Sequence, residues 1–120
     1  MKARLIIWGT LGLGIALVIG VTVQERIDKR RLRGTRKLGN QIVTAMCKYR
    51  DQTGCFPQDL SQLAPDFISV VDQPTWGTRK WHYIQHNCES FGLSAYKNTN
   101  RYPALHCDFE DGERSWWYDD

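Results

Sequence analysis

The chain has 120 residues, of which 42% are hydrophobic and 24% charged, and its formal net charge is +3. This length allows one small domain with a single core and excludes a large multidomain protein. From Leu38 onward the chain carries seven basic and eleven acidic residues, a net charge of −4, so we expect no nucleic-acid partner.

The first expected element is a membrane anchor. Residues 1–4 form a short basic N-terminus, and residues 5–23 carry no charge over a length that suits a bilayer-spanning helix. A cleaved secretory signal is the competing interpretation. Its apolar region would be unusually long, and residues 22–25 offer no small-x-small cleavage site, so we expect an uncleaved single-pass anchor.

A strongly basic segment follows the anchor. Residues 24–37 hold seven basic and two acidic side chains, a net charge of +5. We expect a solvated helix extension whose cations rest on lipid phosphates, with a partner-binding stripe as the alternative. Gly34 and Gly39 interrupt the helix propensity and predict a bend between anchor and domain.

The globular domain, residues 38–120, begins with an amphipathic helix and an abrupt stop. Apolar residues recur at spacings of three and four up to Arg50, which predicts one buried helix face. Gly54 suits the positive φ just past a helix, and Pro57 cannot extend it. The face consists of Leu38, Ile42, Ala45, Met46 and Tyr49.

Aromatic and branched residues predict short strands in the second half of the chain, over residues 81–84, 91–96 and 102–107. Asp111-Gly112 predicts a further turn, and residues 115–118 form either a fourth strand or an aromatic plug under the sheet. The predicted fold class is α+β, with one amphipathic helix packed on a small antiparallel β-sheet.

The order and spacing of one stretch resemble the pseudopilins of type II secretion and the related type IV pilin-like proteins. The resemblance covers about a fifth of the chain. The residues that carry it are Ala45, Tyr49, Gly54, Phe56, Pro57, Leu60, Leu63, Pro65, Phe67 and Ile68, followed by Pro74, Trp76, Gly77, Trp81 and Tyr83. Among these residues, we expect the side chains of Tyr49, Phe56 and Leu60 to contact one another at the junction of the helix end, the loop and the sheet.

The resemblance implies a structural or assembly component of a type II secretion or type IV pilus-type system, and no enzyme. Its partners would be the membrane and other envelope or pilin-like proteins. The location would be the bacterial inner membrane, with a single span and the C-terminal domain in the periplasm. The positive-inside rule alone favours a cytoplasmic domain. Four cysteines and five tryptophans, together with the resemblance, lead us to expect the periplasm.

The chain departs from the family at its N-terminus. Pilin-like proteins carry a leader ending in glycine and a glutamate inside the apolar segment, which is thought to neutralise a neighbour's new amine in the fibre. Here the corresponding run is Gly9-Thr10-Leu11-Gly12-Leu13, with no glutamate. We therefore expect no prepilin processing and a mature chain that begins at Met1 or Lys2.

Cys47, Cys55, Cys88 and Cys107 show no C-x-x-C spacing, which disfavours a zinc site with His82, His86 or His106. A disulfide framework accounts for them better in an extracytoplasmic domain. We expect the pairs Cys47–Cys55 and Cys88–Cys107, although four cysteines allow three connectivities.

An acidic cluster surrounds the expected turn near the C-terminus. It comprises Asp108, Glu110, Asp111 and Glu113. Major pseudopilins hold calcium in their C-terminal loops, so the resemblance makes these residues calcium candidates. They match no EF-hand loop, and a solvated acidic turn is the favoured interpretation; we expect no cofactor otherwise.

No Ser-His-Asp ordering, phosphate loop or HExxH motif is present, so the residues indicate no catalytic chemistry. The aromatic residues favour core packing, since aromatics supply much of the burial in a small domain. Exposed, they would support the alternative function of an anchored envelope binding module for cell-wall glycan or an envelope protein. They are Trp76, Trp81, Trp116, Trp117 and Tyr118.

Overall fold

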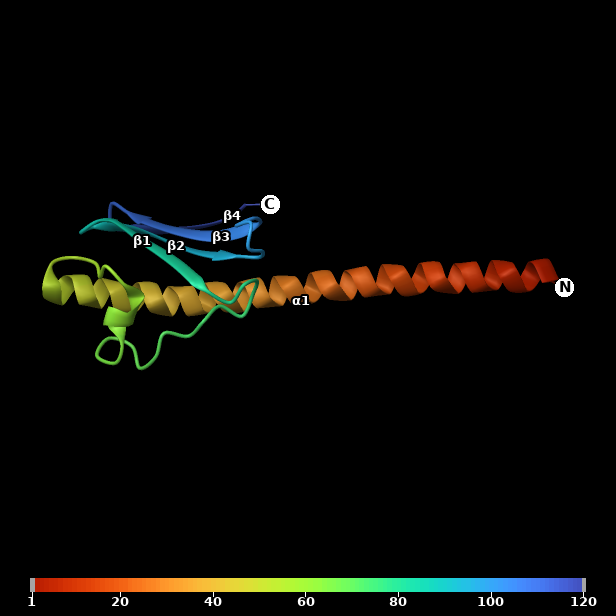
Figure 1. Cartoon of the computed structure of the whole chain (residues 1–120), viewed down its shortest axis with the longest axis horizontal. Coiled ribbons are helices and arrows are strands. Elements are labelled where there is room, and N and C mark those ends of the chain that lie inside the picture. The colour runs from red at the N-terminus through yellow and green to blue at the C-terminus, as the bar shows by residue number, and fades with distance from the viewer. Residues whose placement is uncertain (1, 120) are drawn as a thin grey trace. The chain divides into compact units, whose positions relative to one another are not determined.

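The computed structural model describes the backbone of residues 2–119 and the side chains of residues 14–119. Figure 1 shows its elements in chain order. They are the helix α1 (Lys2–Thr53), the short 3-10 helix η1 (Leu60–Leu63) and the strands β1 (Trp81–Asn87), β2 (Ser90–Tyr96), β3 (Ala104–Glu110) and β4 (Glu113–Asp119). The chain divides into two compact units, Met1–Arg30 and Arg31–Asp120.

The four strands form one antiparallel meander in the order β1-β2-β3-β4. Between β3 and β4, Asp111 and Gly112 both have positive φ, at 54° and 79°, and Glu110 pairs with Glu113. Two consecutive positive φ values are the mark of the tight hairpin turn that Asp-Gly favours. The predicted turn and the fourth strand are therefore confirmed, and the aromatic-plug alternative is wrong.

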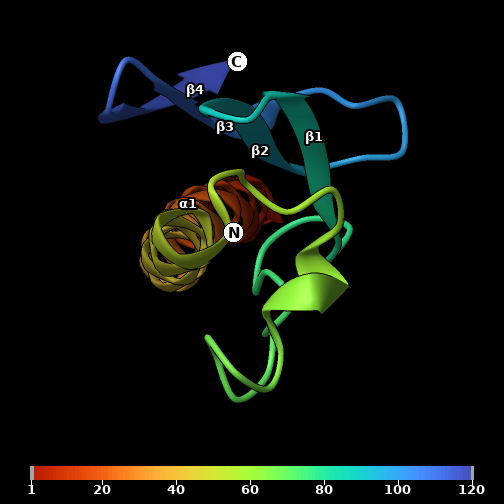
Figure 2. The ribbon, with the colours of Figure 1, turned by 90° about the vertical axis from the view of Figure 1, so that its left-hand side faces the viewer.

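Within the unit Arg31–Asp120, α1 lies along one face of the sheet (Figure 2). Side chains from α1, from the loop after it and from the middle strands share one core. Its buried members are Ile42, Val43, Ala45, Met46, Phe56, Leu63, Phe91, Leu93, Cys107 and Phe109. The predicted α+β class is confirmed, and the predicted helix face is extended by Val43, which is fully buried.

α1 continues without a break through Gly34 and Gly39, where the sequence predicts a bend. Gly39 serves packing instead. A Cβ placed on it would lie 2.8 Å from Cζ2 of Trp116 and 3.2 Å from Cη2 of Trp81. The missing side chain therefore lets two indole rings reach the helix backbone.

The end of α1 follows the predicted pattern. Gly54 has a φ of +86°, and its N–H donates to the Arg50 carbonyl at 2.7 Å. At the next element Asp59 caps η1, because its carboxylate accepts from the Ser61 N–H at 2.8 Å while Gln62 Oε1 accepts from the Asp59 N–H at 3.2 Å. This reciprocal capping box fixes where the loop turns back toward the sheet.

Part of the expected membrane span, residues 5–13, lies outside the residues whose side chains are described. Over the described residues, no helix combines the length and the apolar character that a membrane crossing requires.

Candidate functional site

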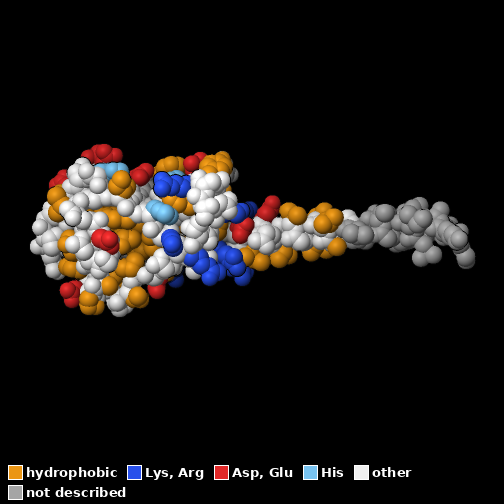
Figure 3. Space-filling view, in the orientation of Figure 1, with side chains coloured by type: hydrophobic (Ala, Val, Ile, Leu, Met, Phe, Trp, Pro, Cys, Tyr) orange, Lys and Arg blue, Asp and Glu red, His pale blue; other side chains and the backbone are white. Residues whose placement is uncertain are grey.

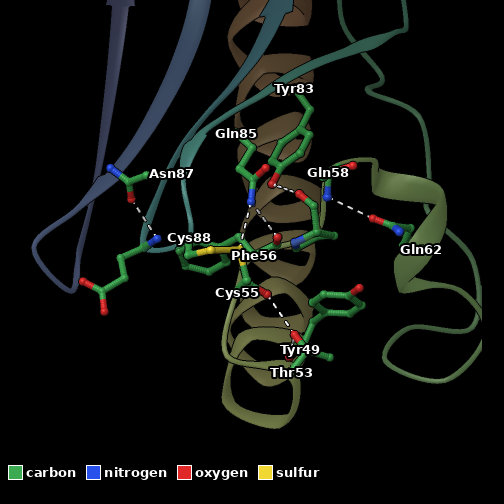
Figure 4. The surroundings of a disulfide bond; sticks show 12 residues. Tyr49, Thr53, Cys55, Phe56, Gln58, Gln62, Tyr83, Gln85, Asn87 and Cys88 are labelled. Atoms are coloured by element: carbon green, nitrogen blue, oxygen red, sulfur yellow. Dashed lines mark hydrogen bonds between the residues drawn. A yellow bond between two sulfur atoms is a disulfide. The ribbon is translucent and has the colours of Figure 1, made fainter.

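The loop that follows α1 is fastened to β1 at several points (Figure 4). Cys55 and Cys88 form a disulfide, and the Phe56 N–H donates to the Cys88 carbonyl at 3.0 Å. Gln85 Nε2 donates to the Phe56 carbonyl at 2.9 Å, and the Tyr83 hydroxyl donates to the Pro57 carbonyl. Gln85 Nε2 also donates to Cys55 Sγ at 3.1 Å, so one covalent bond and four hydrogen bonds hold the loop after α1 against β1 and its turn.

The expected disulfide pairs, Cys47–Cys55 and Cys88–Cys107, are not formed. Cys107 pairs with Leu93 in the middle of the sheet and is fully buried, whereas Cys88 lies in the β1–β2 turn beyond the pair Asn87 and Ser90. Cys88 therefore bonds to Cys55 in the loop after α1, and not to Cys107 within β3. Sequence spacing does not reveal this choice, because it depends on strand register.

Cys47 and Cys107 are free thiols. Burial raises the pKa of the Cys107 thiol to about 11, and burial also raises the pKa of Cys47. A thiol reacts through its thiolate, so both groups are poor nucleophiles near neutral pH. Their role in this fold is packing: Cys107 belongs to the core and Cys47 packs against it.

Phe56 lies at the centre of the junction between loop and sheet. Its ring is 4.8 Å from that of Phe91 and 5.2 Å from that of Phe109, in edge-on contacts. The Arg50 guanidinium lies 4.9 Å from the Phe56 ring centre. The burial of Phe56 is therefore confirmed, although its nearest rings come from the sheet.

Tyr49 and Leu60, expected beside Phe56, both pack against the same core. The aromatic partner of Tyr49 is Phe67, at 5.2 Å between ring centres. Tyr49 and Leu60 thus border the core that contains Phe56, and Phe67 from the loop after η1 joins them there.

The tryptophans divide into structural and exposed groups. Trp76 is buried, Trp81 Nε1 donates to the Asp72 carbonyl at 2.8 Å, and Trp116 Nε1 donates to Asn40 Oδ1 at 2.9 Å. Trp117 and Tyr118 remain 45% and 41% exposed. Only these two of the five predicted aromatics present substantial surface to a partner.

A row of rings crosses the face of the sheet that α1 does not cover. His82 and Tyr96 lie 4.3 Å apart, Tyr96 and His106 lie 6.3 Å apart, and His106 stacks on Trp117 at 4.1 Å. These residues come from all four strands. Sequence reasoning missed the row, although the two-residue alternation of each strand carries the signal.

The acidic candidates occupy the β3–β4 hairpin. Asp108 Oδ2 accepts from Trp117 Nε1 at 2.9 Å, and Glu110 faces Glu113 across the turn at Asp111. Among the described residues, no three His, Cys, Asp or Glu side chains are grouped so that they could hold a metal ion. We therefore assign no calcium site to them.

A groove of about 660 Å³ separates η1 from the start of β1. Leu60, Val71, Trp81 and Tyr83 line it, and each of them also packs against the core. The floor of the groove is therefore the outer surface of the core. Long polar side chains border it, from Gln58, Gln73, Arg79 and Lys80.

In the unit Met1–Arg30, α1 exposes an apolar surface (Figure 3). All side chains described over residues 14–23 are exposed. The large ones are Ile15, Leu17, Val18, Ile19, Val21 and Val23, between 49% and 66% exposed. Within this stretch, the described side chains do not divide into an apolar and a polar face.

No protein family, no curated protein and no solved structure matches the chain.

Proposed function

We propose that the protein is a membrane-anchored, pilin-like structural component of an envelope assembly such as a type II secretion or type IV pilus-type system. The observation that carries this proposal is the exposed apolar surface of α1 over residues 14–23. Burial of apolar surface is worth about 25 cal/mol per Å², so a stretch that is apolar on all sides demands an apolar surrounding.

A lipid bilayer supplies that surrounding. The charge-free segment, residues 5–23, extends over roughly 28 Å at about 1.5 Å per helical residue, close to the thickness of a hydrocarbon core. Exposed cations follow it at Arg26, Lys29 and Arg30, where they would meet lipid phosphates. The expected single-pass anchor in a bacterial inner membrane accords with this order of apolar and basic segments.

An extracytoplasmic position of the domain is supported by the disulfide. Cys55–Cys88 ties the loop after α1 to the β1–β2 turn, and such bonds persist in oxidising compartments. The layout of one long helix followed by a four-stranded antiparallel sheet is compatible with a pilin-like protein. We infer a periplasmic domain that acts through association with other envelope proteins and not through catalysis.

The alternative is an anchored binding module. Its specific support is the row of rings on the uncovered sheet face, where Trp117 and His82 are exposed. The two functions differ in what α1 does: an assembly component uses it for association, whereas a binding module uses it as an anchor alone.

Membrane extraction of the expressed full chain tests the anchoring on which both functions depend. The parent is expected to remain in the membrane pellet through an alkaline carbonate wash and to enter solution only with detergent. Val18→Arg places a charge in the apolar stretch, at a cost of about 2.5–3.5 kcal/mol in a bilayer centre, and should release a large fraction. Val18→Leu is the matched control and should behave as the parent. Release of the parent itself by carbonate would contradict the proposal.

A further inference from the structure

The uncovered face of the sheet contains a hollow centred on Gly92. Gly92 lies in β2 between Ile84 of β1 and Asp108 of β3. A Cβ at Gly92 would meet Ile84 Cγ2 at 3.4 Å, His86 Nε2 at 3.5 Å and Asp108 Oδ1 at 3.6 Å. The space that a side chain would occupy is therefore walled by one apolar, one imidazole and one carboxylate group.

This hollow continues into a pocket of about 280 Å³. Its further walls are His82, Ser94, Tyr96 and Arg101. The volume is at the small end for ligand pockets. It suits a ligand group of one ring better than an extended peptide. The pocket thus offers ring surfaces at one side and hydrogen-bonding groups at the other.

The polar groups around the pocket are held in place. Trp117 Nε1 donates to Asp108 Oδ2 at 2.9 Å, which leaves Oδ1 of the same carboxylate beside the hollow. Ser94 Oγ and His106 Nδ1 lie 2.7 Å apart, and His106 stacks on Trp117. Orientation before binding lowers the entropy that a ligand must overcome.

Although His82 is exposed, partial desolvation of its ring lowers its pKa, and nearby Arg101 and Lys80 lower it further, so the ring is neutral near pH 7. The neutral ring lies 4.3 Å from that of Tyr96. The two rings lie against each other at a tilt of 37°, so they form a compact uncharged pair at one side of the pocket.

The combination of groups decides the ligand class. A carboxylate oxygen accepts, a guanidinium donates, and imidazole and hydroxyl groups do either, whereas the rings offer apolar surface. A phosphate chain is disfavoured, because the Asp108 carboxylate stands beside the hollow and offsets the positive charge of Arg101. A saccharide has hydroxyls that both donate and accept, and C–H faces that stack on rings.

We propose that the hollow at Gly92 is a saccharide-binding site, in which Asp108 and Arg101 hydrogen-bond sugar hydroxyls and the His82–Tyr96 pair supplies the apolar contact for the C–H face of the sugar. This site is independent of the anchoring role of α1. It shares His82 and Tyr96 with the row of rings that supports the alternative function, and it names a ligand class for that binding module.

The test is an NMR titration of the full ¹⁵N-labelled chain in dodecylphosphocholine micelles, a detergent without sugar. The probes are the β-1,4-linked trimers of N-acetylglucosamine and of glucose, and a single-stranded oligothymidine. At least one trimer is expected to produce saturable shifts at Ser94 and Asp108, with millimolar affinity, and the oligonucleotide none.

Gly92→Val fills the hollow with a residue that suits a strand and should weaken binding at least about tenfold, which is 1.4 kcal/mol. Val70→Thr is the control at an exposed loop position outside the pocket and should bind within about twofold of the parent. Arg101→Gln, on an exposed loop, is a second test variant in case Gly92→Val folds poorly. Its affinity for the trimer should also fall at least about tenfold. Absence of saturable shifts with both trimers, unchanged binding in Gly92→Val or Arg101→Gln, or oligonucleotide shifts at this pocket would overturn the proposal.

Discussion

The indole of Trp116 lies directly over the backbone of Gly39, so that a Cβ on the glycine would come within 2.8 Å of Cζ2 of the ring. Trp116 Nε1 also donates to Asn40 Oδ1 at 2.9 Å, and the Arg114 guanidinium donates to the same oxygen at 3.2 Å. Close packing on Gly39 and two hydrogen bonds to Asn40 therefore fix the position of β4 on one turn of α1.

Gly39→Ala should destabilise the domain. Alanine raises helix propensity by about 1 kcal/mol relative to glycine, but overpacking at a site this tight costs about 1–3 kcal/mol and more where the ring cannot move. We expect a net loss, seen as a lower midpoint of thermal unfolding by near-ultraviolet circular dichroism. Gly34→Ala is the milder comparison and should lower the midpoint less, since a Cβ there meets only the Thr75 hydroxyl, at 3.3 Å. A stabilised Gly39→Ala variant would show that Trp116 does not rest on the helix.

Phe56→Ala should cost about 3–5 kcal/mol of unfolding free energy, the range for emptying a buried aromatic site. Its ring touches those of Phe91 and Phe109, and domains of this size have only about 5–15 kcal/mol in total. The variant should melt far below the parent or fail to fold. Gln58→Ala, at an exposed neighbouring site, should change stability by less than about 0.5 kcal/mol. Equal melting of Phe56→Ala and the parent would refute the packing described here.

Peptide mapping without reduction should recover Cys55 linked to Cys88, with Cys47 and Cys107 as thiols. In the folded protein Cys107 should resist alkylation longer than Cys47, because it is fully buried. Removing the bond with Cys55→Ser and Cys88→Ser together should cost about 3–4 kcal/mol, from the chain-entropy estimate for a loop of this length. Recovery of Cys47–Cys55 or Cys88–Cys107 peptides would contradict the structure.

Tyr83 should make stability fall at alkaline pH. Burial raises the pKa of its phenol to about 12 in the folded protein, above the ordinary value of 10.0. The unfolded chain therefore loses this proton first, so the contribution is complete below pH 10 and is lost as pH rises toward 12. Tyr83→Phe should show a smaller loss of stability over this interval in denaturant titrations.

The exposed Tyr102 provides the control for this pH effect. Tyr102→Phe should retain the full alkaline loss of the parent. If Tyr83→Phe and the parent lose stability equally between pH 10 and 12, the phenol of Tyr83 is not protected at the junction.

Local chemistry made much of the fold predictable. Gly54 and Pro57 define the end of α1, and Asp111-Gly112 defines the last hairpin, because each acts through its own backbone preference. Burial of Phe56 followed from its position just after the helix stop. These features need no knowledge of which strands are neighbours.

Features that depend on register were not predictable. The Cys55–Cys88 bond requires that Cys88 project from the β1–β2 turn toward the loop, and the role of Gly39 requires Trp116 to cross the helix at that residue. The hollow at Gly92 likewise exists only because Ile84 and Asp108 flank it from two other strands. A single sequence carries the alternation of each strand but not the alignment between strands.

Photo-crosslinking from α1 in intact membranes tests the proposed assembly role most directly. A photoreactive amino acid replaces Val18, which is 64% exposed in the apolar stretch. A second variant carries it at Val70 in the domain, where the exposed fraction is similar at 58%. An assembly component should give a ladder of protein adducts from position 18 on illumination, containing further copies of the chain or other small membrane-anchored proteins. Position 18 linked to lipid alone, with the protein remaining at the mass of one chain, would contradict the assembly role and leave α1 as an anchor only.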